Sequence, residues 1–319
     1  MTGEPTVGLS TVAEAPPWEA EGRPRPTWGL AEGDEIAPGR TVLRRLGGGQ
    51  RYEVFLVWDD HWLAVLVAKI LRPDQVAEVA ALRDLGHEAA ALARLAHPVI
   101  VRGFDAVTDG PMPHLLIEHL EGPTLRALIE REGALAAEQA LPLGLHVASA
   151  LHYLAAEGMV HLDVKPENVV MGAPPRLIDL SVARPLAAAA RLRGPVGTDA
   201  YMAPEQCAPE RLGELVGPPA DVWGLGATLH HAFSGSRPFP REKDARDSDD
   251  PLVRFPQLSA QPEPLPERAP ERLRSLLESM LERNPANRPT ASEVAAALEP
   301  SVAELPRKMA FSRRGSRVW

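Results

Sequence analysis

The chain has 319 residues, of which 45% are hydrophobic, and such a chain buries enough apolar surface for two compact units. Its formal net charge of −9 argues against nucleic acid as the main partner, because phosphate backbones require clustered Lys and Arg. The sequence has no apolar run of about 18 residues and does not begin with a basic and apolar leader, so we expect no membrane span and no secretory signal.

The first segment, residues 1–36, is rich in Pro, Glu and Gly and has little periodicity. We interpret it as a mainly disordered extension whose Trp28 region packs on the domain that follows. The single cysteine, Cys207, cannot form an intramolecular disulfide, which fits a reducing cytoplasm. A small buried residue is the better interpretation of Cys207 than a reactive thiol.

The next elements are a glycine-rich turn, an apolar strand and a helix. The turn lies in LGGGQRYEV (46–54), which taken alone is typical of an ordinary hairpin, and LVAKIL (66–71) predicts a β-branched strand. A helix is predicted over about 75–96, because Pro98 stops it and Glu88, Leu92 and Leu95 share one face. An apolar strand then ends in a polar turn in LLIEHLEG (115–122).

Two further helices are predicted in the second half of the chain. Apolar residues repeat at helical spacing from Pro142 until Gly158, and the stretch Val222 to Phe233 is apolar nearly all round, as in a helix buried within a domain. Thr290 with Glu293 forms the pattern of a capping box for a final helix.

The most informative string is HLDVKPENVV (161–170), which sets Asp163, Lys165 and Asn168 at offsets 0, +2 and +5. Phosphoryl transfer requires these three groups together. A carboxylate orients the hydroxyl and accepts its proton, a cation neutralises the γ-phosphate, and an amide oxygen binds magnesium. The string is therefore a candidate catalytic loop.

Four partner strings follow in the order LIDLS, GTDAYMAPE, DVWGLG and NPANRPT. With the turn, strand and catalytic loop they make seven ordered motifs over about 250 residues. Together they resemble the protein kinases, and the eukaryotic-like serine/threonine kinases of bacteria in particular. The resemblance implies an α+β bilobal fold over residues 37–300, with a small antiparallel-sheet lobe (37–118) that carries one main helix and a larger, mostly helical lobe (122–300). A basic tail, 301–319, follows.

The resemblance also implies where ATP and its metal bind. Lys69 would hold the phosphates, Glu88 would pair with Lys69, and Ile117 would line the back of the adenine pocket, with main-chain groups of Glu118 and Leu120 bonded to the base. Asn168 and Asp179 would bind Mg²⁺, or Mn²⁺ in its place. The full set expected around the nucleotide is Gly47, Gly48, Gly49, Val54, Ala68, Lys69, Ile117, Glu118, Leu120 and Val170.

The same resemblance assigns the catalytic roles and the substrate class. Asp163 would orient the substrate hydroxyl, Lys165 would steady the γ-phosphoryl group, and Thr198 would bond to both. Lys165 together with Thr198 is the pattern of serine/threonine kinases, so protein Ser and Thr side chains are the expected acceptors. Arg288 is expected to form a buried ion pair with Glu205.

Three positions depart from the family pattern. Tyr52 replaces the third glycine of the turn, Leu162 replaces the Arg before the catalytic Asp, and Ser181 replaces the Gly after the metal-binding Asp. An active protein kinase is our interpretation, because all six chemically necessary groups are present. A nucleotide-binding pseudokinase that acts as a scaffold is the alternative, and a small-molecule phosphotransferase of related fold is a third.

Regulation is expected to differ from that of many relatives, in which an Arg at the Leu162 position binds a phosphorylated activation segment. Residues 182–197 contain no Ser, Thr or Tyr, so the usual acceptors are missing together with the Arg. We therefore expect activity without phosphorylation of this segment. Regulation would then depend on the tails, or on a partner that binds the acidic and Pro-rich stretch 241–268. An inert surface insertion is an equally good interpretation of this stretch.

Overall fold

The computed structural model describes residues 25–212, 215–242 and 244–305. The chain divides into two compact units: the first comprises Met1–Leu85 and Phe104–His119, and the second comprises Gly86–Gly103 and Leu120–Trp319. The helix α1, Val79–Arg94, runs from the first unit into the second. A small sheet unit and a larger helical unit are the architecture that the sequence predicts.

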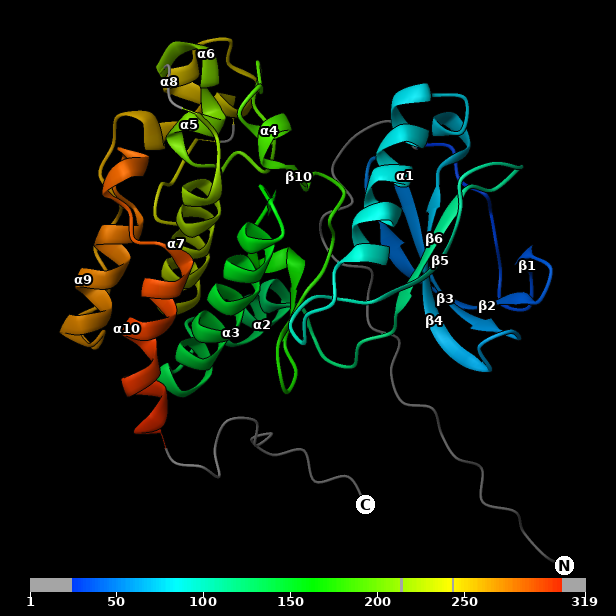
Figure 1. Ribbon diagram of the computed structural model, residues 1–319, viewed down its shortest axis with the longest axis horizontal. Helices are drawn as coiled ribbons and strands as arrows, with labels where there is room; N and C mark the ends of the chain where they lie inside the picture. Colours follow the sequence, from blue (N-terminus) through cyan, green and yellow to red (C-terminus); the bar gives the residue numbers. More distant parts are fainter. Residues whose placement is uncertain (1–24, 213–214, 243, 306–319) are drawn as a thin grey trace, which may run out of the picture. The chain divides into compact units, whose positions relative to one another are not determined.

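The first unit is built on a six-stranded sheet in the order β1-β2-β3-β4-β6-β5 (Figure 1). Neighbouring strands from β1 to β4, and β4 with β6, are antiparallel. Short connections make this possible, because antiparallel strands need only a tight turn between them. The strands are β1 (Glu35–Ala37), β2 (Arg40–Gly48), β3 (Tyr52–Asp59), β4 (Ala64–Leu71), β5 (Gly103–Val107) and β6 (His114–Glu118).

One face of this sheet is covered by the chain that precedes it. Trp28 and Leu30 pack against the buried cluster of β2, β3, β4 and β6. The Trp28 indole Nε1 donates to the carbonyl of Leu71 at 2.7 Å, and its backbone N–H donates to Glu53 Oε2 at 2.9 Å. Trp28 therefore packs as expected. Residues 1–24 of the predicted extension and 306–319 of the predicted tail lie outside the described residues.

The second unit is mainly helical, and its described part contains two pairs of two-residue strands, β7 with β10 and β8 with β9. Short 3-10 turns interrupt the loops at Pro166–Asn168, Asp244–Asp247, Pro256–Leu258 and Pro285–Asn287. The described helices are α2 (Leu125–Glu132), α3 (Ala137–Ala156), α4 (Leu186–Ala189), α5 (Pro204–Cys207), α6 (Pro209–Leu212), α7 (Pro218–Ser234), α8 (Pro251–Arg254), α9 (Glu271–Met280) and α10 (Ala291–Ala303). The short strands are β7 (Met159–Val160), β8 (Val169–Val170), β9 (Arg176–Leu177) and β10 (Arg184–Pro185).

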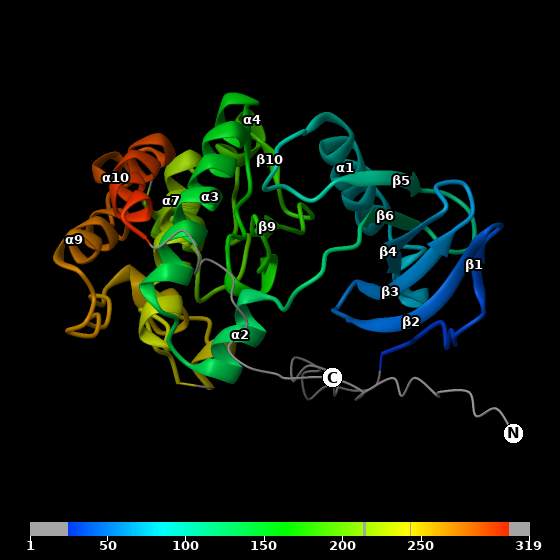
Figure 2. The same ribbon diagram turned by 90° about the horizontal axis from the view of Figure 1, so that it is seen from below.

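Helices α3, α7 and α10 form the core of this unit and lie side by side (Figures 1 and 2). Gly144 on α3 allows the close approach, because a Cβ there would lie 2.9 Å from Leu298 Cδ1 and 3.0 Å from Leu229 Cδ1. Such distances are shorter than van der Waals contact permits. A side chain at this position would force the ends of the Leu298 and Leu229 side chains to shift.

Helix α3 begins earlier than the sequence predicts, at Ala137 and not at Pro142. Pro142 lies inside the helix, where its missing N–H removes one hydrogen bond. The turn before it is nevertheless helical because Ala140 and Leu141 are buried there, 0% and 5% exposed. Burial of this apolar turn outweighs the local cost of the proline.

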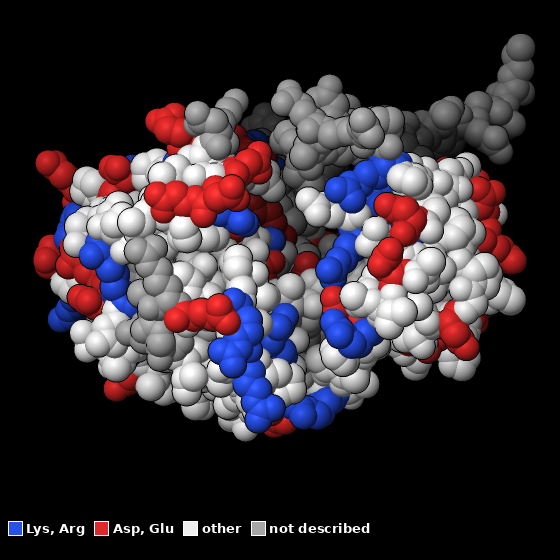
Figure 3. Space-filling view, turned by 90° about the horizontal axis from the view of Figure 1, so that it is seen from above, with Lys and Arg blue, Asp and Glu red and all other residues white. Residues whose placement is uncertain are grey.

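The capping box predicted for the last helix is confirmed. The Thr290 side chain accepts from the backbone N–H of Glu293, while Glu293 Oε2 accepts from the N–H of Thr290 at 2.7 Å. No helix in the described part of the chain is long and apolar enough to cross a membrane. On the face shown in Figure 3, acidic and basic side chains both occur on each unit, so neither unit presents a surface of one sign there.

Candidate active site

The predicted catalytic loop of the second unit brings its three polar side chains into direct contact. Lys165 Nζ lies 2.7 Å from Asp163 Oδ2 and 2.6 Å from Thr198 Oγ1. Asn168 Nδ2 donates to the carbonyl of Asp163 at 2.9 Å and to its Oδ2 at 3.1 Å. Thr198 is 33 residues from Lys165 in the sequence, and the fold brings the two side chains together, whereas the expected bond from Thr198 to Asp163 stays a prediction. One ammonium therefore links the loop to the segment that carries Thr198.

Asp163 has one oxygen left over from these contacts. Its Oδ2 accepts hydrogen bonds from Lys165 and Asn168, whereas its Oδ1 is buried and has no hydrogen-bond partner among the described residues. A buried acceptor without a partner is unfavourable unless something else bonds to it. The free Oδ1 fits an incoming hydroxyl group.

The backbone of the catalytic loop is held from α7. Asp221 is buried, and its two carboxylate oxygens accept the N–H groups of His161 and Leu162, each at 2.7 Å. Burial raises the pKa of Asp221, and these hydrogen bonds and nearby His161 oppose the rise. Leu162 has a φ of 64°, in the left-handed region that is uncommon for non-glycine residues. Asp221 stabilises this strained turn and so fixes the direction of Asp163.

A short hairpin places the two expected metal ligands at one end. Strand β8 follows Asn168 directly and pairs antiparallel with β9, which ends two residues before Asp179. The N–H of Ile178 donates to the carbonyl of Asn168 at 2.8 Å. Asp179 also has a left-handed φ, of 67°, and its Oδ1 accepts from the N–H of Ser181 at 3.2 Å.

The donor set of this hairpin fits a hard divalent cation. Asn168 uses its Nδ2 toward Asp163, so its Oδ1 is the amide atom left for a metal. One amide oxygen and one carboxylate are donors of the kind that Mg²⁺ prefers, and Mg²⁺ usually takes its other ligands from water and substrate phosphates. Among the described residues, no three His, Cys, Asp or Glu side chains form a metal cluster.

The sheet of the first unit aligns the expected nucleotide-binding residues in one row. Gly47 pairs with Val54 across β2 and β3, and Val54 pairs with Lys69 across β3 and β4. Residues directly opposite each other in antiparallel strands share a face. On β6, Ile117 pairs with Val67.

Ala68 corrects one expectation. Side chains alternate along a strand, so Ala68 points to the face opposite Lys69. It is fully buried in the cluster with Phe55, Ile70 and Leu116, the cluster that Trp28 covers. Val67, two residues before Lys69, takes the place that we expected for Ala68.

The glycine-rich turn is tight and is held by Arg72, the residue that follows β4. The N–H of Gly49 donates to the carbonyl of Tyr52 at 2.9 Å, and a Cβ on Gly48 would lie only 2.7 Å from that same oxygen. Arg72 Nε donates to the carbonyl of Gly49 at 2.8 Å. Glycine is therefore required at position 48, because a Cβ there would clash with the backbone.

The other expected residues lie on the elements predicted for them. Glu88 is buried on α1 and 1% exposed, and its pairing with Lys69 stays a prediction. Val170 is on β8 of the second unit and Glu118 ends β6 of the first. Leu120 begins the second of the two stretches that form the second unit, and the bonding of its main chain and that of Glu118 to a base also stays a prediction.

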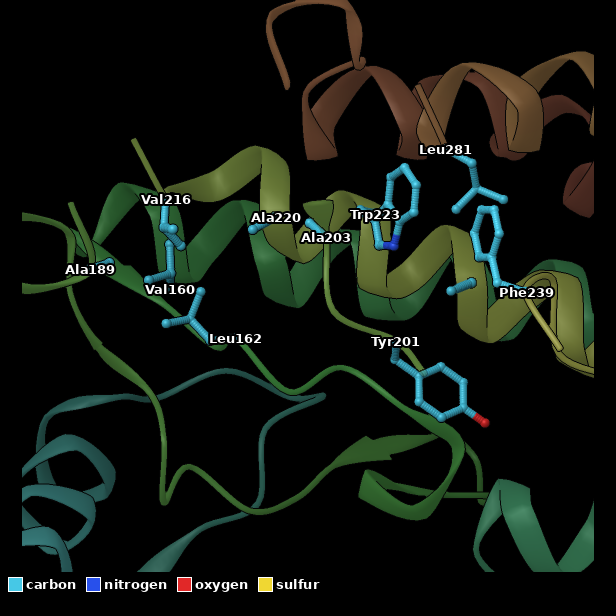
Figure 4. Packing of buried hydrophobic residues seen from close by; sticks show 11 residues of the cluster. Val160, Leu162, Ala189, Tyr201, Ala203, Val216, Ala220, Trp223, Phe239 and Leu281 are labelled. Atoms are coloured by element: carbon cyan, nitrogen blue, oxygen red, sulfur yellow. The ribbon is translucent and has the colours of Figure 1, made fainter. Parts of the chain in front are cut away.

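The segment between Asp179 and Glu205, called here the activation segment, is packed through apolar side chains. Its strand β10 pairs with β7, with Arg184 opposite Val160. Leu162 is buried together with Ala189 and Val216, and it lies with them at one end of the cluster (Figure 4). The segment residues Val182, Leu186, Leu192 and Val196 pack against this cluster.

The end of the segment is fixed by the buried ion pair that the sequence predicts. Arg288 Nη1 and Nη2 bind Glu205 Oε1 and Oε2 at 2.6 and 2.8 Å, and both side chains are 0% exposed. Arg288 also donates to three backbone carbonyls and stacks over the ring of Trp223, 5.0 Å from its centroid. A buried bidentate pair with its remaining donors satisfied is the favourable form of such a bridge.

Sequence reasoning missed two side chains that hold the loop and the segment together. Asp221 was part of a recognised string, but its role depends on a backbone turn at Leu162 that no pattern predicts. Gln206 Nε2 donates to the carbonyls of Leu162 and Val196, both at 2.9 Å, and thereby ties the activation segment to the catalytic loop.

Comparison with known proteins agrees with this geometry. The family described as "Protein kinase domain" matches residues 40–297. The chain is 30% identical over 203 residues to "Serine/threonine-protein kinase PknB" of Mycobacterium leprae, which covers 61% of this chain and 32% of that protein. It is 34% identical over 278 residues to "Probable serine/threonine-protein kinase PkwA" of Thermomonospora curvata, covering 84% of this chain and 35% of that protein. The chain thus spans about one third of the length of these curated relatives.

Proposed function

Because this chain belongs to the protein kinase family, we propose that it is an ATP-dependent protein serine/threonine kinase. It transfers the γ-phosphoryl group of Mg-ATP to Ser or Thr hydroxyls of protein substrates. The observation that carries the proposal is the contact of Lys165 Nζ with both Asp163 and Thr198. The names of the relatives, PknB and PkwA, support the same substrate class.

The geometry supports a direct in-line transfer. The substrate hydroxyl bonds to the free Oδ1 of Asp163, and its oxygen attacks the γ-phosphorus. The new O–P bond forms as the bond from the γ-phosphorus to the β,γ-bridging oxygen breaks, ADP leaves, and the hydroxyl proton passes to the Asp163 carboxylate. Lys165 neutralises charge on the transferred group. The reaction requires positioning and charge neutralisation more than covalent help.

Asn168 and Asp179 would hold the magnesium ion through one oxygen each. When bound, the ion neutralises the phosphate oxygens. In the first unit, Lys69 and the backbone of the turn at Gly48 are the groups that we expect to bind phosphates. Without the ion, the Asp179 carboxylate repels the triphosphate, so ATP should bind tightly only with Mg²⁺ or Mn²⁺.

The kinase acts without phosphorylation of its activation segment. Leu162 offers no charge to a phosphate and is instead packed with Ala189 and Val216. Thr198 is engaged with Lys165 at 2.6 Å, and a phosphate there would place negative charge beside Asp163. The segment is ordered by apolar packing and by the ion pair of Glu205 with Arg288, without a phosphate.

A nucleotide-binding pseudokinase is the second candidate, and one observation favours it. Tyr52 replaces a glycine of the turn, and its ring lies on the Lys69 ammonium, 5.0 Å from centroid to Nζ. A scaffold would bind ATP without transferring phosphate. The cytoplasmic location, the identity of the protein substrates, and partner binding through 241–268 or the tails stay predictions.

Transfer of labelled phosphate to a generic protein substrate separates the two candidates. The parent chain should label the substrate, and Asp163→Asn, which removes the base but keeps the shape, should lower labelling at least 100-fold on the scale of losing one catalytic group. A thermal-shift titration with ATP, with and without chelator, tests the metal. Equal stabilisation in both conditions and no labelling would favour the pseudokinase.

A further inference from the structure

The carboxylate of Asp199, in the activation segment, forms ion pairs with two arginines from a distant stretch of the chain. Arg241 Nη1 lies 2.9 Å from Asp199 Oδ2, and Arg254 binds the same carboxylate through Nε at 3.1 Å and Nη2 at 3.3 Å. Both arginines lie in the stretch 241–268, for which the sequence left a partner-binding loop or an inert insertion as alternatives. It is bound to the activation segment.

A third side chain of this stretch fixes the backbone at the same place. Gln257 is 1% exposed, and its Nε2 donates to the carbonyl of Asp199 at 2.6 Å and to that of Met202 at 3.1 Å. Arg241 Nη1 also donates to the carbonyl of Arg254 at 2.9 Å, which joins the two arginines directly. Side chain and backbone of Asp199 are thus held together. We call Arg241, Arg254 and Gln257 the Asp199 clamp.

The clamp is one residue away from the catalytic contacts. Thr198, next to Asp199, accepts from Lys165 Nζ at 2.6 Å, and its carbonyl accepts from the N–H of Tyr201 at 2.8 Å. Residues 198–202 therefore form one hydrogen-bonded turn. A shift of Asp199 would move Thr198, and displacements near 1 Å matter for a positioned reaction.

The charge of Asp199 is maintained inside the clamp. Burial alone would raise the pKa of this half-buried carboxyl, but hydrogen bonds from Arg254 and Arg241 outweigh it and lower the pKa. The carboxylate is therefore ionised at neutral pH. Two guanidinium groups around one fixed anion are also how proteins bind a phosphorylated segment.

We infer that Arg241, Arg254 and Gln257 are positioning residues that order the activation segment around the permanent anion Asp199. They thereby set the affinity for the protein substrate. In relatives, a phosphate on the segment performs this ordering. This inference rests on the proposed function. It assigns a role to residues 241–258 and explains how the activation segment, which has no Ser, Thr or Tyr at 182–197, is held next to Thr198.

The test compares Asp199→Asn, Asp199→Glu, Arg241→Met and Arg254→Met with matched controls. The controls Glu132→Gln and Arg131→Met remove the same charges from an exposed pair on α2, 2.8 Å apart. We expect Asp199→Asn and each Arg→Met variant to raise KM for the protein substrate at least fivefold and to leave KM for ATP within twofold. Asp199→Glu, which restores the anion, should recover most of the loss. In the double variant Asp199→Asn with Arg254→Met, the fold-increase in KM for the protein substrate should be smaller than the product of the two single increases, because the residues are coupled.

Hydrogen exchange at the amides of 196–203 is the second measurement, and it needs no kinase activity. Exchange there should be faster in Asp199→Asn than in Glu132→Gln. An unchanged KM for the protein substrate overturns the inference, whether or not exchange changes. If no variant and no parent protein transfers phosphate, the proposed function fails, and the exchange comparison alone decides whether the clamp orders the segment.

Discussion

The ammonium of Lys69 lies over the ring of Tyr52, with Nζ 5.0 Å from the ring centroid. Tyr52 and Lys69 are on neighbouring strands and on the same face of the sheet. A cation–π contact contributes about 0.5–1 kcal/mol at an exposed site and more when desolvated. If Lys69 binds the phosphates of ATP as proposed, Tyr52 competes with them for its ammonium.

Removing the ring should tighten ATP binding. We expect Tyr52→Leu, which keeps an apolar strand residue without a π face, to lower KM for ATP about two- to fivefold, the equivalent of about 0.5–1 kcal/mol. Tyr52→Phe keeps the ring and is the matched control. Steady-state kinetics at fixed protein substrate give both values. A higher KM for Tyr52→Leu than for Tyr52→Phe would show that the ring assists ATP binding.

Loss of the Lys69 charge should reduce turnover without loss of the fold. Lys69→Met removes a charge that stabilises the transition state, so kcat should fall at least about 100-fold, on the scale of losing one preorganised electrostatic group. Circular dichroism and melting temperature should stay near those of the parent. Activity within threefold of the parent would mean that Lys69 does not hold the phosphates.

Breaking the buried pair of Glu205 and Arg288 should destabilise the second unit strongly. Glu205→Gln leaves the Arg288 charge buried without its partner, which costs about 3–5 kcal/mol of unfolding free energy. Glu132→Gln, at an exposed pair, should cost less than about 1 kcal/mol. Urea denaturation of both variants provides the comparison. The interpretation of the pair is wrong if the two losses are equal.

The stability of the second unit should fall as the solution becomes acidic, partly through His231. Burial, and then the charges of Arg126 and Arg237, lower the pKa of His231 to about 4, and Tyr201 Oη lies 2.7 Å from its Nδ1. The unfolded chain, with a pKa of about 6.5, binds a proton below that pH that the folded chain does not. The contribution of neutral His231 to the unfolding free energy is therefore fully present above about pH 6.5 and is lost as the pH falls toward about 4.

The variant His231→Gln isolates this contribution. It keeps an acceptor for the Tyr201 hydroxyl but has no titrating group. Between pH 7.5 and pH 5, the parent should lose about 2 kcal/mol more unfolding free energy than the variant. His114 and His230, whose pKa values burial also lowers, titrate in both proteins and cancel in the difference. Parallel pH profiles of the two proteins would refute the role of His231.

Local patterns in the sequence predict the residues that do chemistry and the elements that carry them. The spacing of Asp163, Lys165 and Asn168 is set by the covalent chain, so it is visible without a fold. Thr198 and Arg288 were also predictable, but only because strings around them resemble those of the protein kinase family. Their contacts at 2.6 Å with Lys165 and Glu205 depend on the fold alone.

The sequence predicts less well the direction in which a side chain points and the contacts between residues that are far apart in the chain. Ala68 was expected beside the nucleotide, although the twofold alternation of β4 turns it to the opposite face. The start of α3 was placed at Pro142, because proline is a strong local signal and burial of the preceding turn is not a local one. Asp221 and the Asp199 clamp join residues from 40 to 60 positions apart, and no periodicity indicates such pairs.

The central claim is that this chain is an active kinase whose activation segment is ordered without phosphate. The most direct measurement is the protein-kinase activity of phosphatase-treated enzyme at first turnover, with mass spectrometry of the same sample before and after treatment. We predict unchanged activity and no phosphate on residues 179–205. If phosphatase treatment abolishes activity and the lost phosphate maps to Thr198, the account is contradicted.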